Sequence, residues 1–146
     1  MAETEFARSA ENFQYWLANM SDALEDYLET VPASLKNKLD FSETSLRPFE
    51  AHLLERFNDV DALLNDDGLD GAAIYTGEAF RKLAGGTWAL SDNAEGELYH
   101  GLPVLNDVGL RQTVVCPHFL VRSVVQKRRG DVLAKLLKRN LTEMSI

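Results

Sequence analysis

The sequence contains few of the residues that build disulfides, metal sites and catalytic centres. A single cysteine, Cys116, excludes an internal disulfide and fits the reducing cytoplasm. Three histidines, His52, His100 and His118, fall on different predicted elements, and neither HExxH nor a paired CxxC motif occurs. We therefore expect no metal and no cofactor. A Cys116 nucleophile with His100 or His118 as its base is an alternative, but a buried, unreactive thiol is the commoner role.

Long apolar runs and familiar catalytic motifs are also missing. No apolar stretch approaches the roughly 18 residues of a membrane span, and the first six residues include two glutamates and no basic residue, unlike a signal peptide. No P-loop, GxGxxG or GxSxG motif occurs. We expect a cytoplasmic protein without a membrane partner. The sequence favours a non-catalytic protein and leaves an enzyme as the alternative.

Basic residues are scarce in the first half of the chain. Residues 1–70 carry 16 acidic and 5 basic side chains, whereas residues 71–146 carry 7 acidic and 10 basic ones, within a net charge of −8. Seven of those bases lie between Arg122 and Arg139. This stretch lacks the interleaved aromatics or glycine-rich loops of a nucleic-acid module, and the acidic half would repel a polyanion. We expect no nucleic-acid partner.

Apolar residues near the N-terminus recur at alternating steps of four and three, which is the helical period. The stripe consists of Phe6, Ala10, Phe13, Leu17, Met20, Leu24, Tyr27 and Val31. It predicts one long helix or two helices, the second restarted at Ser21 or Asp22. The stripe would suit a homodimer seam over residues 6–31. Because Trp16 and Leu28 widen it, docking on the chain's own domain is favoured.

Two further helices are predicted in the first 86 residues. Ser42 and Ser45 compete to cap the first of them. Its buried stripe consists of Leu46, Phe49, Leu53, Phe57, Val60 and Leu64. The next helix begins near Asp70, stops at Gly85-Gly86, and presents a narrow face of small residues to its neighbours.

Strand-like segments follow at residues 87–90, 98–105 and 110–115, and the short turns between them favour antiparallel pairing. Pro103 lacks an N–H donor, so we expect it at an edge or a bulge. Pro117 suits the first position of a helix that Gly130 ends. A strand at residues 119–125 stays an alternative because that run is rich in β-branched residues.

The sequence thus predicts an α+β fold: N-terminal helices packed on a small antiparallel sheet of about three strands, with C-terminal helices. Asp131 is expected to cap the last of those helices. Residues 1–146 fit one domain, with an amphipathic helical region at 1–32 and a core at 38–140.

One predicted helix carries a glycine in its interior. Gly77 costs about 1 kcal/mol there relative to alanine, so we expect another backbone to approach it closely. Glu78 and Arg81 have the i, i+3 spacing that lets opposite charges pair. The pair would be either a clamp of the fold or the floor of a site that also uses Tyr75 and Trp88.

Three short motifs resemble a set of small uncharacterised bacterial proteins. They are Leu39-Asp-Phe-Ser-Glu-Thr-Ser-Leu46, Ala73-Ile-Tyr-Thr-Gly-Glu-Ala-Phe-Arg81 with Gly85-Gly-Thr-Trp88, and Pro117 with Gly130-Asp-Val-Leu133. The similarity covers about residues 38–140. It implies a compact helical protein with a small sheet and no assigned function. The residues it points to are Asp40, Ser42, Tyr75, Gly77, Glu78, Arg81 and Trp88.

Two classes of function fit these features. The favoured one is an acidic protein–protein interaction module, of inhibitor or immunity type, that binds a basic protein. The alternative is a small-molecule-binding protein or enzyme with a pocket around Glu78 and Arg81. A self-associating structural protein is a third interpretation.

Overall fold

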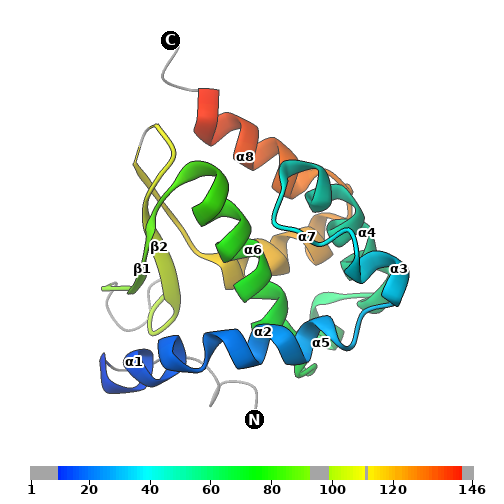
Figure 1. Ribbon diagram of the computed structural model, residues 1–146, viewed down its shortest axis with the longest axis horizontal. Coiled ribbons are helices and arrows are strands. Elements are labelled where there is room, and N and C mark those ends of the chain that lie inside the picture. The colour runs from blue at the N-terminus through cyan, green and yellow to red at the C-terminus, as the bar shows by residue number, and fades with distance from the viewer. Residues whose placement is uncertain (1–9, 93–98, 111, 143–146) are drawn as a thin grey trace.

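The computed structural model describes residues 10–92, 99–110 and 112–142. It is the predicted α+β fold, in which a small antiparallel sheet lies at one side of a group of helices (Figure 1). The helices are α1 (Ala10–Ala18), α2 (Met20–Leu28), α3 (Ala33–Lys36), α4 (Leu46–Arg56), α5 (Val60–Leu64), α6 (Gly68–Ala84), α7 (Pro117–Lys127) and α8 (Val132–Thr142), with a 3₁₀ helix (Glu43–Ser45) before α4. The strands are β1 (Thr87–Leu90), β2 (Pro103–Val108) and β3 (Thr113–Val115).

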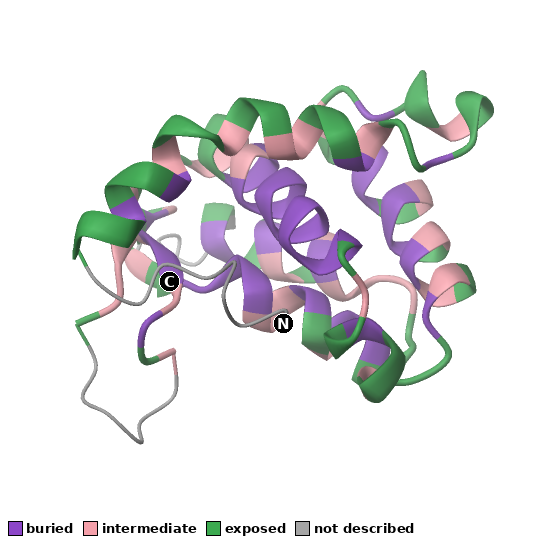
Figure 2. Ribbon diagram, turned by 90° about the horizontal axis from the view of Figure 1, so that it is seen from below, coloured by how far each residue is buried: buried purple, intermediate pink, exposed green. Residues whose placement is uncertain are grey.

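Helix α6 runs through the middle of the molecule, with other elements on all sides (Figure 1), and it is purple for most of its length in Figure 2. From Gly68 to Phe80 every residue except Glu78 is buried. The prediction that only a narrow face of this helix contacts its neighbours is therefore wrong. Small residues permit the close packing: a Cβ on Gly71 would lie 2.2 Å from the Cβ of Tyr27 in α2. As predicted, the helix ends at the double glycine, where Gly85 has a φ of +86°.

The N-terminal stripe forms two helices, α1 and α2, which are separated at Asn19. The side-chain amide of Asn19 donates to the carbonyl of Tyr15 at 2.8 Å, and α2 restarts at Met20. Phe6 lies outside the described residues. Trp16 and Tyr27 are buried against the chain's own core, so the stripe serves intramolecular packing, as favoured. A homodimer through residues 6–31 stays a prediction.

Each of the two candidate serines directly precedes a helix, but neither side chain makes a capping hydrogen bond. Ser42 precedes the 3₁₀ helix, and Ser45 precedes α4. The predicted continuous stripe to Leu64 is wrong, because the carboxylate of Asp59 accepts the N–H of Ala62 at 2.8 Å and starts α5 as a separate helix. The phase of the new helix buries Leu63 and leaves Leu64 38% exposed.

The sheet has the order β1-β2-β3, and both pairs are antiparallel. The second strand begins later than predicted, at Pro103, and continues to Val108 through part of the expected turn. Placing Pro103 at an edge or bulge is wrong: it is the first residue of the central strand, opposite Leu90. A strand's first position tolerates a missing N–H. The register shift lies instead between Leu105 and Val108.

Residues 119–125 are helical, within α7, and Pro117 occupies its first turn as predicted. The helix ends before Gly130, because Arg128 adopts the left-handed conformation with a φ of +53°. From there its guanidinium donates to the carbonyls of Leu54 (2.7 Å) and Phe57 (2.8 Å) at the end of α4. These bonds satisfy carbonyls that the helix itself leaves unpaired.

Helix α8 is capped from a distant part of the chain. The fully buried carboxylate of Glu50 accepts the N–H groups of Val132 (2.9 Å) and Leu133 (3.0 Å). A carboxylate at a helix N-terminus is favourable because it meets both free donors and the helix dipole. The expectation that Asp131 caps this helix is therefore wrong, since Glu50 caps it. The Asp131 side chain instead pairs with Lys135 at 3.2 Å.

Candidate functional site

Three of the predicted site residues meet where α6 ends and β1 begins. The Glu78 carboxylate accepts the Nε–H of Arg81 at 2.9 Å and the indole N–H of Trp88 at 2.7 Å on Oε2, while Oε1 accepts the second Arg81 nitrogen at 3.0 Å. We call these three residues the Glu78 cluster. It joins α6 to the first strand of the sheet, and both oxygens of its carboxylate accept hydrogen bonds from protein donors.

The electrostatics of the Glu78 cluster favour an ionised carboxylate. Burial alone would raise the pKa of Glu78, but the hydrogen bonds from Arg81 and Trp88 outweigh it and hold the pKa below its usual value. The Glu78 side chain is 15% exposed and that of Arg81 is 41% exposed. A carboxyl group with a lowered pKa is a poor general acid at neutral pH. These features suit a structural pair better than a catalytic one.

Gly77 faces the rings of a tryptophan and a proline. The expectation that another backbone approaches it closely is therefore wrong. A Cβ built on Gly77 would lie 2.3 Å and 2.4 Å from two ring carbons of Trp88, and 3.0 Å from Cγ of Pro117. The absence of a side chain at Gly77 lets the Trp88 ring pack closely against α6. In that position the Trp88 N–H reaches Glu78. The ring therefore contacts both the glycine and the glutamate of the motif at residues 73–81.

Tyr75 belongs to a different cluster, together with residues of the motif at 39–46. Its buried hydroxyl lies 2.7 Å from Oγ of Ser45 and accepts the backbone N–H of Phe41 at 3.0 Å. Asp40 accepts the backbone N–H of Ser42 at 3.1 Å and also its hydroxyl, and these bonds lower the pKa of Asp40. The two motifs are thus joined through Tyr75, and the structure separates it from the Glu78 cluster.

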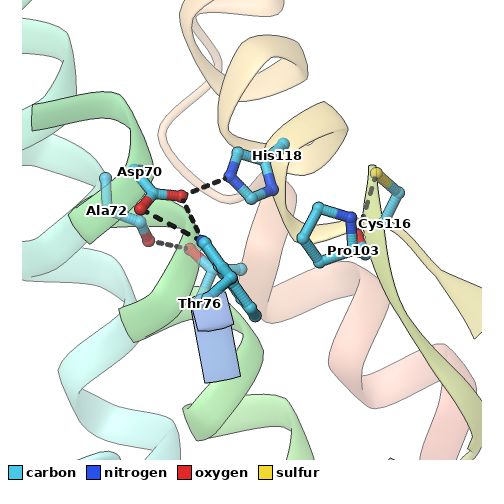
Figure 3. Close-up of polar contacts among 7 residues, drawn as sticks. Asp70, Ala72, Thr76, Pro103, Cys116 and His118 are labelled. Carbon is cyan, nitrogen blue, oxygen red and sulfur yellow. Dashed lines mark hydrogen bonds and ion pairs between the residues drawn. The ribbon is translucent and has the colours of Figure 1, made fainter. Parts of the chain in front are cut away.

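A buried polar network that the sequence analysis missed lies at the other end of α6 (Figure 3). The Asp70 carboxylate accepts the indole N–H of Trp16 at 3.1 Å and lies 2.8 Å from Nε2 of His118. Trp16 also packs edge-on against Trp88, with ring centroids 5.1 Å apart. The network therefore ties α1, α6 and α7 together. The only available signal was one aspartate inside an otherwise small and apolar helix start, since its partners are 54 and 48 residues away.

Cys116 is close to His118 in sequence but has a different environment. Its thiol is buried and lies 3.7 Å from the carbonyl of Pro103 (Figure 3). Burial raises the pKa of Cys116 to about 11. Since the thiolate is the reactive form, this thiol is unsuited to nucleophilic catalysis.

Acidic residues from separate elements meet around a cavity of about 270 Å³ between α2 and the start of α6. Its walls include the carboxylates of Asp26, Asp67 and Asp70, together with Tyr27 and Arg56. Arg56 already pairs with Asp66 at 2.9 Å, a residue that is not part of this lining. The balance of charge at the cavity is therefore negative. We call it the acidic cavity.

Within the part of the chain that the structure describes, no group of three His, Cys, Asp or Glu side chains could hold a metal ion. None of the described helices has the length and apolar character needed to cross a bilayer. Comparison with models of protein families, with curated proteins and with solved structures finds no match to this chain. The resemblance to small uncharacterised bacterial proteins stays a prediction.

Proposed function

We propose that the protein is a non-catalytic binding module whose acidic surface recognises a basic protein, in the manner of an inhibitor or immunity-type protein. The observation that carries this proposal is the charge of α2 and its surroundings. Between Ala10 and Leu35 the chain has five acidic residues and no lysine or arginine. On α2 itself, Asp22, Glu25 and Asp26 are all exposed.

Further acidic residues lie at the start of α5, a helix that packs on α6 and α7, and directly before α6. Asp59, Asp61 and Asp67 are exposed there, and Asp26 and Asp67 face the same acidic cavity. We call the exposed carboxylates of α2 together with these three the acidic face. A lysine or arginine side chain of a partner would find several carboxylates and a concavity in one place, which favours specific rather than diffuse attraction.

Basic residues are gathered on the far side of the molecule. Lys135, Lys138 and Arg139 are exposed on α8, whose described residues include no acid. Helix α8 lies at one end of the view in Figure 1, and α1 and α2 lie at the other. This separation gives the protein a strong charge asymmetry, which steers and orients an oppositely charged partner as it approaches.

The alternative, a small-molecule site or enzyme around Glu78 and Arg81, has less support. Both oxygens of Glu78 accept protein hydrogen bonds, and its pKa is lowered rather than raised. Three protein donors thus occupy most of the acceptor positions of this carboxylate. The Glu78 cluster is better explained as a contact that holds α6 on the sheet.

The test is affinity capture from source cells with a charge-reversed variant and a matched control. Glu25→Lys with Asp26→Lys reverses part of the acidic face, whereas Glu43→Lys with Glu55→Lys makes the same charge change on exposed residues elsewhere. We expect a basic partner that the wild type and the control retain, and that the Glu25/Asp26 variant loses by at least about tenfold, as for two close charge pairs. Equal retention by both variants would refute the role of the acidic face.

A further inference from the structure

Four basic side chains line a cavity of about 270 Å³ between α7, α8 and the connection that joins the two helices. Lys127 comes from α7, Arg129 from the connection, and Lys135 and Arg139 from α8. Asp131 is the acidic residue of the same lining, so positive charges outnumber negative ones there by four to one. We call this space the basic cavity.

Helical spacing explains why these charges gather on one side. Ser123 and Lys127 are four residues apart on α7, as are Lys135 and Arg139 on α8. Residues at this spacing lie on the same face of a helix. Each helix therefore turns a polar edge toward the space between them, and the short connection adds Arg129.

Most of this positive charge is not neutralised by the protein. Lys135 pairs with Asp131 at 3.2 Å, and its side chain is still 71% exposed. No carboxylate in the described part of the chain pairs with the other three bases, which are also exposed. Glu50 lies at the start of α8, but its carboxylate is fully buried and accepts the N–H groups of Val132 and Leu133. The basic cavity therefore attracts anions.

The number and type of the cations favour a diphosphate group. Guanidinium groups bind phosphate through two parallel hydrogen bonds, and lysine binds it as a point charge. A phosphate monoester carries a charge of about −1.5 to −2 at pH 7, so one phosphate neutralises only part of the three-charge excess of the lining. Two linked phosphates match that excess better. The volume lies just below the roughly 300–1,000 Å³ of most small-molecule sites, which suits a compact group.

An apolar cavity of about 360 Å³ adjoins the basic cavity among β3, α7 and α8. The two share Leu120, Ser123 and Leu136, and the walls of the larger one also include Val115 and Phe119. An organic body attached to the diphosphate has room there.

We propose that the basic cavity binds the diphosphate group of a small anion, with Lys127, Arg129 and Arg139 donating to its oxygens. Exposed charges more than about 8 Å apart are largely screened at physiological salt, and α8 and α2 lie at opposite ends of the view in Figure 1. A compact ligand therefore meets mainly the local cations, whereas a long polyanion also meets the acidic half of the chain. The site is separate from the acidic face, so its test is independent of the proposed function.

Pyrophosphate is the minimal probe, with orthophosphate as the single-phosphate comparison, both without divalent cations. Methyl resonances of Leu120, Val132 and Leu136 report on the basic cavity, and those of Leu24 and Leu28, which line a cavity at α2, serve as an internal control. We expect saturable pyrophosphate shifts at the first three residues and at least about tenfold weaker binding of orthophosphate, which makes fewer charge-assisted hydrogen bonds.

ADP and geranyl diphosphate carry the same group on different organic bodies. Tighter binding than that of pyrophosphate, with an added shift of the Val115 methyls, identifies the body that fills the apolar cavity. If neither ester binds more tightly, the ligand is the free diphosphate.

Variants locate the diphosphate. Lys127→Gln with Arg139→Gln removes one charge from each helix and should weaken pyrophosphate binding by about tenfold or more, the usual size of lost charge-assisted hydrogen bonds. Lys36→Gln with Lys38→Gln removes the same charge from exposed residues in and after α3 and should change the affinity by less than about twofold. All four positions are exposed, so both variants should fold. Equal weakening by the two pairs, shifts confined to the α2 cavity, equal affinity for orthophosphate, or no saturable binding of any of the three diphosphates would overturn the proposal.

Discussion

Replacing Gly77 with alanine tests how α6 meets the sheet. The new methyl group would lie 2.3 Å and 2.4 Å from two carbons of the Trp88 ring. Carbon atoms in good packing contact are about 3.5–4.0 Å apart, so the ring must move by more than an ångström. Because the Trp88 N–H reaches Glu78 at only 2.7 Å, that movement would also stretch or break the hydrogen bond.

The net effect is a balance of three terms. Alanine gains about 1 kcal/mol of helix propensity over glycine. Overpacking a well-packed region costs about 1–3 kcal/mol, and a hydrogen bond to a charged group contributes about 1.5–3 kcal/mol. We therefore expect Gly77→Ala to lower the free energy of unfolding by about 2–4 kcal/mol, which for a domain of this size lowers the melting temperature by roughly 5–15 °C.

Chemical and thermal denaturation of four proteins would measure this effect: the wild type, Gly77→Ala, Trp88→Leu and the double variant. Removing the indole removes the two closest atoms, which leaves Cγ of Pro117 at 3.0 Å as the nearest neighbour. In the Trp88→Leu background, alanine at position 77 should therefore cost at least about 1 kcal/mol less than in the wild type, a coupling typical of residues in contact. A Gly77→Ala variant as stable as the wild type, or equal costs in both backgrounds, would show that this packing argument is wrong.

Glu78→Gln should destabilise the protein by about 1–2 kcal/mol at neutral pH, less than a fully buried pair because Arg81 is 41% exposed. Since the folded pKa of Glu78 is lowered, this contribution is present above its unfolded pKa and is lost as the pH falls through the folded value. Denaturation between pH 7 and 3 should show the variant and the wild type converging at the acid end. Tyr75→Phe removes the hydroxyl that serves Phe41 and Ser45, so urea titration should show a loss of about 1–3 kcal/mol. Cys116 should react with a thiol reagent at pH 8 far more slowly in the native than in the unfolded protein, as absorbance kinetics would record. Fluorescence anisotropy with a labelled oligonucleotide at about 50 mM salt should detect no saturable binding at low micromolar protein, because the acidic half opposes the basic stretch.

The features that the sequence predicted correctly depend on local chemistry. Helical periodicity identified the N-terminal helices, the double glycine marked the end of α6, and Pro117 marked the start of α7. The i, i+3 spacing placed Glu78 and Arg81 together. Each of these signals acts within a few residues, so it survives in any tertiary setting.

The features that were missed depend on contacts between distant segments. The end of α4 is stabilised by Arg128, 71 residues from Phe57, and the start of α8 by Glu50, 82 residues from Val132. The β-branched run at 119–125 became a helix because its three valines, Val121, Val124 and Val125, are buried in the core. Tertiary burial overrides propensity in such cases.

The partners of Asp70 show the same limit for the candidate site. A single aspartate in a small-residue helix start predicts some buried partner, because buried carboxylates are paired. Nothing in the local sequence says that the partners are Trp16 and His118. The acidic face could be predicted only in part. The charge of α2 is visible in the sequence, whereas the position of Asp67 at the same cavity as Asp26 is a property of the fold.

Hydrogen exchange on the protein alone and in complex with its captured partner tests whether the acidic face binds that partner, because it locates the interface on the chain. We expect slower amide exchange in the complex at residues 21–30 and 59–70, which carry the acidic face, and unchanged exchange at residues 132–141 of α8. Slower exchange confined to α7 and α8, with residues 21–30 and 59–70 unaffected, would contradict it.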